Sequence, residues 1–349
     1  MRALALLVAT LAACARPAPP PAAQAPAAEL ALPGERHLRN VRQLTFGGEN
    51  AEAYFSFDGR ELVFQATPEG GGCDQAYVMR ADGSGTRRIS NGEGQVTCGY
   101  FLPDGARILF SSTHASGKAC PPKPDMSEGY VWALHDYQLY TVRPDGSDPR
   151  PLAPAPGSYN AEATVSREGW IVFTSTRDGD LELYKMRADG SELTRLTRTP
   201  GYDGGAFFSA DGRRIVFRAS RPSGAAREDY ERLLARRLVR PGKLEIHVMN
   251  ADGSGERQVT RLGAASFAPF FHPDGRRILF SSNVGDPRGR NFDLYMVNDD
   301  GTGLERITTS DTFDGFPMFS PDGRKLVFAS NRNARRPGET NVFIADWVE

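Results

Sequence analysis

A strand–turn–strand pattern recurs six times along the chain and limits the architectures that it can adopt. In residues 314–332, Pro321-Asp322-Gly323 is typical of a tight turn, because proline presets one backbone angle and glycine accepts a positive φ. The apolar run 326–329 that follows indicates a strand packed between two layers. The other five copies are centred on Asp58, Asp104, Glu168, Asp211 and Asp274. A repeat of roughly 40 to 65 residues in strands predicts a propeller or an array.

Each copy is followed by a second hairpin, so one repeat holds four strands. In residues 181–197, an Asp-Gly pair separates two short strands, which is a strong hairpin signal. The sixth repeat ends after its third strand, in residues 341–349, whereas residues 41–45 match a fourth strand. The sequence therefore predicts an all-β fold, a six-bladed β-propeller of four-stranded blades closed by the N-terminal strand, which pairs with the last blade and removes the open edges.

The N-terminal segment predicts export and lipid attachment. Residues 1–14 hold Arg2, a short apolar run and the sequence Leu-Ala-Ala-Cys, which ends at Cys14. The run is too short to span a bilayer and is typical of a secretory signal. The match to the bacterial lipoprotein box predicts that the Cys14 thiol receives a lipid, with an ordinary signal peptide as the alternative. Residue Ala15, which is not aspartate, favours the outer membrane.

Residues 15–35 are mostly alanine and proline, which predicts an extended tether between the membrane and the domain of residues 36–349. The formal net charge of −1 indicates neither nucleic-acid binding nor polybasic docking on a membrane. We therefore expect a monomer in the bacterial cell envelope, a periplasmic lipoprotein anchored at the outer membrane.

The repeat resembles the β-propeller repeat of TolB, the periplasmic component of the Tol–Pal system. The resemblance rests on Phe-Ser-Pro-Asp-Gly, Leu-Tyr-x-Met and Arg-Leu-Thr segments within residues 41–347, and related repeats occur in prolyl-oligopeptidase-type peptidases. The α/β domain that precedes the propeller in TolB is expected to be absent, with the tether in its place. The resemblance implies a periplasmic, ring-shaped binding surface.

The two faces of the predicted ring differ. The Asp-Gly turns of one face are short and nearly interchangeable, whereas the loops of the other face carry insertions at residues 113–136, 221–243, 283–291 and 331–340. Variable loops on a rigid scaffold are the usual place for binding. We therefore expect the partner on the variable face.

Polar residues near the start of the innermost strands are predicted to surround the tunnel mouth on this face. They are Asn50, Glu52, Asn160, Glu162, Asp203 and Asp314. Close carboxylates repel one another unless a cation, a basic ligand or a proton intervenes. The pattern predicts a site for a basic peptide segment or for a divalent cation such as Ca²⁺. The alternative is that these residues cap loops and bond backbone amides.

Three cysteines, Cys73, Cys98 and Cys120, map to the variable face. An oxidising periplasm permits a disulfide, which we expect as Cys98–Cys120 or Cys73–Cys98. A zinc site would need paired spacings that these cysteines lack.

The motifs favour binding over catalysis. The sequence contains neither H-E-x-x-H nor G-x-S-x-G. The expected function is that of a non-catalytic, lipid-anchored periplasmic scaffold for a protein or peptide partner, without a cofactor unless Ca²⁺ binds at the tunnel mouth. The alternative is a propeller enzyme of lyase or hydrolase type, or a metal-dependent glycan-binding module, that combines the acidic mouth with His114 and His135.

Overall fold

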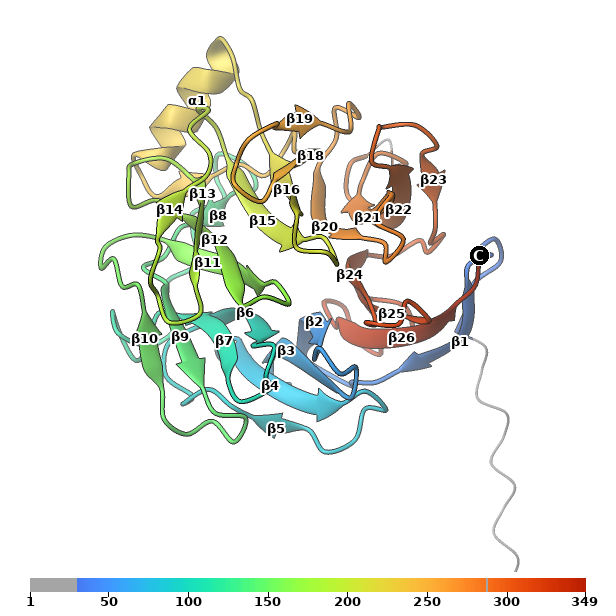
Figure 1. The fold of residues 1–349 in the computed structure, drawn as a ribbon. Helices are drawn as coiled ribbons and strands as arrows, with labels where there is room; N and C mark the ends of the chain where they lie inside the picture. Colours follow the sequence, from blue (N-terminus) through green and yellow to red (C-terminus); the bar gives the residue numbers. More distant parts are fainter. Residues whose placement is uncertain (1–29, 287) are drawn as a thin grey trace, which may run out of the picture.

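Six antiparallel sheets of four strands surround a central axis (Figure 1). The structure is a computed structural model and describes residues 30–286 and 288–349. The predicted six-bladed, all-β propeller is therefore confirmed. The signal sequence, Cys14 and residues 15–29 of the tether lie outside the described residues, so lipidation and anchoring stay predictions.

Every blade runs from an innermost strand at the axis to an outer strand, which is two or three residues long in blades 1 to 5 and six residues long in blade 6. The blades are: blade 1, β2 (Glu49–Phe55), β3 (Glu61–Thr67), β4 (Gln75–Arg80) and β5 (Arg87–Arg88); blade 2, β6 (Val96–Phe101), β7 (Ile108–Ser112), β9 (Gln138–Val142) and β10 (Arg150–Leu152); blade 3, β11 (Asn160–Val165), β12 (Trp170–Ser175), β13 (Glu182–Arg187) and β14 (Thr194–Arg195); blade 4, β15 (Asp203–Phe208), β16 (Arg214–Ala219), β18 (Glu245–Asn250) and β19 (Arg257–Gln258); blade 5, β20 (Ser266–Phe271), β21 (Arg277–Ser282), β22 (Asp293–Asn298) and β23 (Glu305–Arg306); blade 6, β24 (Asp314–Phe319), β25 (Lys325–Ser330), β26 (Asn341–Trp347) and β1 (Leu38–Gln43).

The first strand closes the ring, as predicted. Strand β1 pairs antiparallel with β26, with Leu38 opposite Trp347 and Gln43 opposite Phe343. Leu38 is fully buried, and the ring of His37 stacks on Trp347 with centroids 4.8 Å apart. Both ends of the propeller therefore contribute to one sheet, which leaves no open blade edge at the junction.

Residues 30–35, which the sequence assigned to the tether, pack against blade 6. The buried Glu35 carboxylate forms an ion pair with Arg332, with Oε1 2.8 Å from Nη2, and accepts the backbone N–H of Leu32 at 2.7 Å. Leu30 and Ala31 contact an apolar cluster that blades 5 and 6 share. The packed unit therefore extends at least to Leu30, ahead of the boundary expected at residue 36.

The Asp-Gly turns satisfy their own polar groups. In blade 1, the Ser56 hydroxyl donates to Asp58 Oδ1 at 2.6 Å, and the same oxygen accepts the backbone N–H of Arg60 at 3.0 Å. Gly59 takes a φ of 72°, which a side chain would resist. These local bonds explain why one short sequence recurs at this face.

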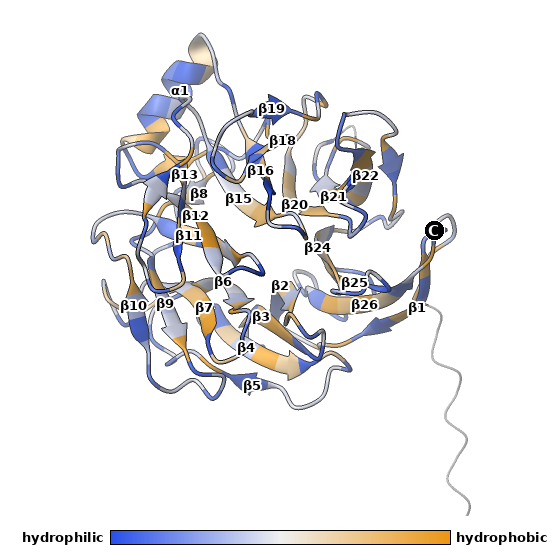
Figure 2. Ribbon diagram, in the orientation of Figure 1, coloured by the Kyte–Doolittle hydropathy of each residue, from blue (hydrophilic) through white to orange (hydrophobic). Residues whose placement is uncertain are grey.

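The core lies between neighbouring blades. The inner strands of each blade are apolar, and the outer strands at the rim of the ring are more polar (Figure 2). The second strand of each blade carries one buried phenylalanine, and these are Phe64, Phe110, Phe173, Phe217, Phe280 and Phe328. Burying each such side chain contributes roughly 1.5–3 kcal/mol. Repetition of this residue in every blade gives the ring a uniform apolar layer.

Two insertions meet over the variable face and form what we call the lid, residues 113–136 and 221–243. Within it, β8 (Trp132–Ala133) pairs antiparallel with β17 (Leu238–Val239), and α1 (Ala225–Leu234) lies between β16 and β18 of blade 4. Glu128 forms ion pairs of 2.6 Å and 2.8 Å with Arg232 and Arg236 across the two insertions. The lid thus links blade 2 to blade 4. None of the helices in the described ranges is long and apolar enough to cross a membrane.

The disulfide differs from both expected pairings. Cys73 in the loop of blade 1 is bonded to Cys120 in the lid, and Cys98 is a buried free thiol. Cys98 belongs to the innermost strand β6, whereas the other two cysteines lie in loops outside the regular strands. The disulfide therefore ties the lid to blade 1.

Candidate functional site

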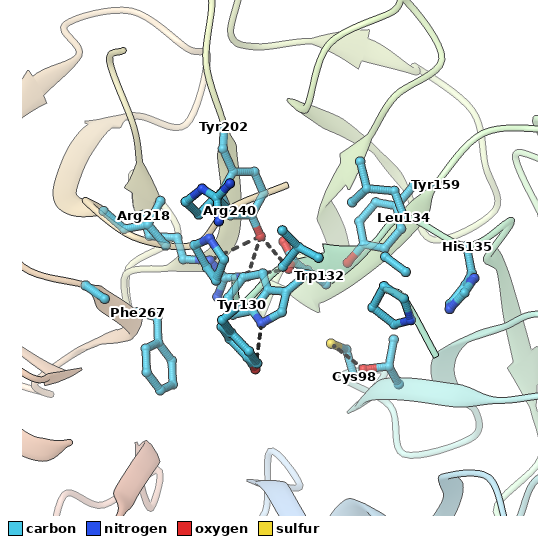
Figure 3. Close-up of a pocket in the computed structure, with 18 of the residues that line it drawn as sticks. Cys98, Tyr130, Trp132, Leu134, His135, Tyr159, Tyr202, Arg218, Arg240 and Phe267 are labelled. Atoms are coloured by element: carbon cyan, nitrogen blue, oxygen red, sulfur yellow. Dashed lines mark hydrogen bonds and ion pairs between the residues drawn. The ribbon is translucent and has the colours of Figure 1, made fainter. Parts of the chain in front are cut away.

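A cavity of about 1090 Å³ lies at the tunnel mouth beneath the lid, and we call it the mouth cavity (Figure 3). All six blades and both insertions of the lid contribute to its wall. Its volume is slightly above the roughly 300–1,000 Å³ that is common for ligand sites. The cavity is therefore large enough for a small molecule or for a short stretch of peptide.

A β-bulge interrupts the innermost strand of every blade at the same position. The pairing register shifts there in all six inner hairpins, and the bulged residue has a left-handed φ between 48° and 58°. These six residues, which we call the tunnel ring, are Glu52, Cys98, Glu162, Gly205, Ala268 and Phe316. Five are not glycine, and each costs on the order of 1–3 kcal/mol in that conformation. Such strain commonly accompanies a site, because a bulge changes the direction of a side chain.

The tunnel ring surrounds a second, narrow cavity of about 30 Å³, which we call the extension because five of its lining residues also line the mouth cavity. The ring has a polar side and an apolar side. Glu52, Cys98 and Glu162 come from blades 1 to 3, whereas blades 4 to 6 contribute glycine, alanine and phenylalanine. Two of the predicted tunnel-mouth residues, Glu52 and Glu162, therefore lie in this ring.

Glu162 is fully occupied by hydrogen bonds. Its carboxylate accepts the Tyr202 hydroxyl at 2.6 Å, the Thr174 hydroxyl at 2.7 Å and the backbone N–H of Gly205 at 2.8 Å. The same carboxylate forms a buried ion pair with Arg218 from β16. The charge of Glu162 is thus balanced, as a buried charge requires.

Arg218 is held by aromatic rings as well as by Glu162. Its guanidinium lies 5.2 Å from the ring centre of Trp132 in the lid and 5.1 Å from that of Tyr202. Burial lowers the pKa of Arg218, but the neighbouring Glu162 carboxylate and the Tyr202 hydroxyl raise it above its ordinary value, so the guanidinium stays charged. A side chain at Gly205 would come within 2.5 Å of Arg218 Nη1, which explains the glycine at that ring position. Figure 3 shows Arg218 between Tyr202 and the aromatic residues of the lid.

Glu52 is the unbalanced acid of the tunnel ring. Its Oε2 is buried and has no hydrogen-bond partner in the part of the chain that the structure describes. Burial raises the pKa of Glu52 to about 7, a hydrogen bond from Cys98 lowers it, and the charge of Glu162 raises it. Burial likewise keeps the pKa of Cys98 well above its ordinary value, so the thiol is protonated and can donate. Near neutral pH this carboxyl changes between its neutral and charged forms.

The other four predicted mouth residues do not line the cavity. Asn160 accepts hydrogen bonds from Ser175 and Arg177, and Asn50 donates to the backbone oxygen of Gly47. Asp203 is paired with Arg221, with 2.7 Å between Oδ1 and Nη1, and Asp314 is paired with Arg332, with 2.9 Å between Oδ2 and Nη2.

The two asparagines are held by bonds to loop carbonyls and neighbouring side chains, and the two aspartates are held by arginines. They precede the bulge, which turns the side chains of Glu52 and Glu162 toward the axis and leaves the earlier residues inside the blades. The expected cluster of four carboxylates is therefore not formed. Among residues 30–286 and 288–349, no group of three or more His, Cys, Asp or Glu side chains is placed to hold a metal ion.

An aromatic wall was missed by sequence analysis. Phe267 packs against Phe316 and Phe313, with ring centroids 5.2 Å and 6.4 Å apart, and the lid adds Tyr130 and Trp132. A signal was present, because blades 5 and 6 place alanine and phenylalanine where blades 1 and 3 have glutamate.

Of the two histidines considered for catalysis, His135 lines the mouth cavity. His114 packs instead on Tyr140, with ring centroids 4.3 Å apart, and its Nδ1 lies 2.8 Å from the Ser112 hydroxyl.

Comparison with known proteins places this architecture among TolB-like propellers. No family model matches the chain. It is 30% identical over 148 residues to a TolB homologue of Chlorobium luteolum, a match that covers 36% of this chain and 34% of the relative. The chain thus spans about a third of that relative's length.

Solved structures support the same fold. The structure of a putative TolB from Agrobacterium tumefaciens is similar with a TM-score of 0.58 and 20% identity, over 86% of this chain and 91% of that one. An oligogalacturonate lyase in complex with manganese is similar with a TM-score of 0.52 and 15% identity, and the match covers 88% of this chain and 93% of the lyase chain. At these identities the likeness concerns the fold alone. The chain has a TolB-like six-bladed β-propeller fold.

Proposed function

We propose that this chain is a binding protein of the bacterial cell envelope that takes a protein or peptide segment into the mouth cavity. The observation that carries the proposal is the mouth cavity itself, about 1090 Å³ of space beneath a lid, with an aromatic wall on one side and charged residues on the other. Aromatic side chains offer large contact areas, and a few polar groups orient the ligand. The similarity to a TolB homologue supports a location in the envelope and a protein partner.

The lipid anchor belongs to the same proposal. The lipoprotein box that ends at Cys14 would hold the propeller at a membrane, with the outer membrane favoured. Metabolic labelling with a radioactive fatty acid should modify the native chain and leave the Cys14→Ser variant unlabelled. Equal labelling of both chains would remove the anchor from the proposal.

Site-directed crosslinking in cells tests partner binding. A photoreactive phenylalanine analogue at the position of Tyr130, an exposed residue of the lid, should capture a defined partner. The same analogue at Arg324, in a turn of the opposite face, is the matched control. The purified partner should then bind the Trp132→Ala variant about tenfold more weakly, which corresponds to about 1.4 kcal/mol. Identical products from both positions, or none from Tyr130, would refute the proposal.

A second candidate function, a propeller enzyme or a glycan-binding module, is favoured by one observation. Glu52 has a pKa of about 7 inside a cavity, which suits general acid or base catalysis near neutral pH. This candidate predicts turnover of an acidic oligosaccharide by the native chain and its loss in the Glu52→Gln variant. Binding of such a sugar without turnover would exclude the enzyme and support a glycan-binding module.

A further inference from the structure

We propose that the tunnel ring is a subsite for a primary ammonium group carried on an apolar stem, either a lysine side chain or the N-terminus of a peptide. This proposal rests on the proposed function, because it assigns a ligand chemistry to the bottom of the same mouth cavity. Its basis is the charge at the ring, the size of the extension and the apolar side of the ring.

The charge at the ring favours a cation. The charge of Arg218 is matched by Glu162, which already has several hydrogen-bond donors. Glu52 has no cationic partner within hydrogen-bond distance among the residues described, and its Oε2 is buried without a donor. A buried acceptor without a partner is costly, so a ligand that donates to it gains free energy on binding. An anion would instead meet two carboxyl groups beside a guanidinium that is already paired.

The size of the extension favours ammonium over larger cations. Its volume of about 30 Å³ is a small fraction of the 1090 Å³ of the mouth cavity, so only the end of a ligand enters it. An ammonium group is a compact point charge, whereas a guanidinium is a wider, planar group with its donors in a fixed fork. The ring therefore should discriminate between lysine-like and arginine-like side chains.

The apolar side of the ring suits the stem of such a ligand. Ala268 and Phe316 belong to the same extension as Glu52, and Phe267 and Phe313 continue the apolar wall into the wider cavity. Amphipathic side chains bury their methylene groups along apolar surface while the charged end reaches a polar group. A lysine stem would follow this wall, with the ammonium at Glu52.

The proposal is tested with three small probes, n-pentylamine, 1-pentanol and n-butylguanidine, by isothermal titration calorimetry at pH of about 8.5, where Glu52 is ionised and the amine is protonated. The native protein should bind n-pentylamine about tenfold more tightly than either other probe. The Glu52→Gln variant should lose this preference and keep its affinity for 1-pentanol. The matched control is Glu69→Gln, because Glu69 is an exposed carboxylate in blade 1 that does not line the cavity.

Unchanged amine binding by Glu52→Gln, or equal binding of amine and guanidine, would overturn the proposal, and so would the absence of amine binding at millimolar concentrations. The crosslinking from Tyr130 does not depend on Glu52, so it decides the proposed function separately. Two peptides, compared at pH of about 7.5 where an α-amino group is still largely protonated, then distinguish the sources of ammonium: one has a free N-terminus and no lysine, and one is N-acetylated with a lysine. Whichever displaces n-pentylamine identifies the source, and displacement by neither would overturn the assignment to a peptide.

Discussion

The Glu52→Gln variant should be more stable than the native protein at alkaline pH and equally stable near pH 4.5. The pKa of Glu52 is raised by burial from 4.5 to about 7, so the folded state holds this proton more tightly than the unfolded state. Raising the pH from 4.5 through 7 therefore costs the folded state free energy, and the cost stays constant at higher pH. A difference of about 2.5 in pKa corresponds to roughly 3 kcal/mol. Glutamine does not titrate and should recover that amount.

The assay is urea unfolding of both proteins at several pH values between about 4.5 and 8.5, followed by circular dichroism. The quantity of interest is the difference in unfolding free energy between variant and native protein, in which unrelated titrations cancel. The neighbouring groups that influence Glu52, namely Cys98, Glu162, Arg218 and Asp74, are retained in both chains.

The difference should rise from near zero at acidic pH to roughly 3 kcal/mol above pH 7. The Glu69→Gln control removes an exposed carboxylate and should stay within about 0.5 kcal/mol at every pH. A difference that does not change with pH would show that Glu52 titrates normally, and the reasoning about an unbalanced acid in the tunnel ring would then be wrong.

Three further perturbations test other parts of the structure. Replacing both Cys73 and Cys120 with serine removes a crosslink over 47 residues and should lower the unfolding free energy by up to about 4 kcal/mol, measured in urea; an unchanged midpoint would contradict the role of the disulfide. Arg218→Met leaves the Glu162 carboxylate buried without its cation and should lower the free energy of unfolding by about 3–5 kcal/mol, measured by thermal unfolding. A loss below about 1 kcal/mol would contradict the assignment of Arg218 as the cation that balances Glu162. Leu38→Ala should cost about 2–5 kcal/mol because Leu38 is fully buried in the closing strand, whereas a negligible loss would argue against ring closure.

The arrangement of blades could be predicted from the sequence because it depends on local signals. Turns such as Pro321-Asp322-Gly323 and the alternation of apolar strands act over a few residues, and six copies reinforce one another. Closure of the ring was also predictable, because the sixth repeat has only three strands and the first strand of the domain belongs to no other blade.

The candidate site was only half predictable, because the direction of a side chain at a bulge is not local information. Residues Asn50 and Glu52 are two apart and would share a face of a regular strand, yet the bulge separates them. Glu52 therefore reaches the tunnel while Asn50 stays inside the blade.

The sequence by itself determined the number of blades, the four strands in each and the closing strand. The tertiary structure alone decided which acids face the tunnel, that Cys73 rather than Cys98 pairs with Cys120, and that two distant insertions form one lid. The physical reason is the range of the forces involved. Strands and turns arise from neighbouring residues, whereas the balance of charge at Glu52 and Arg218 exists only after the blades have packed around one axis.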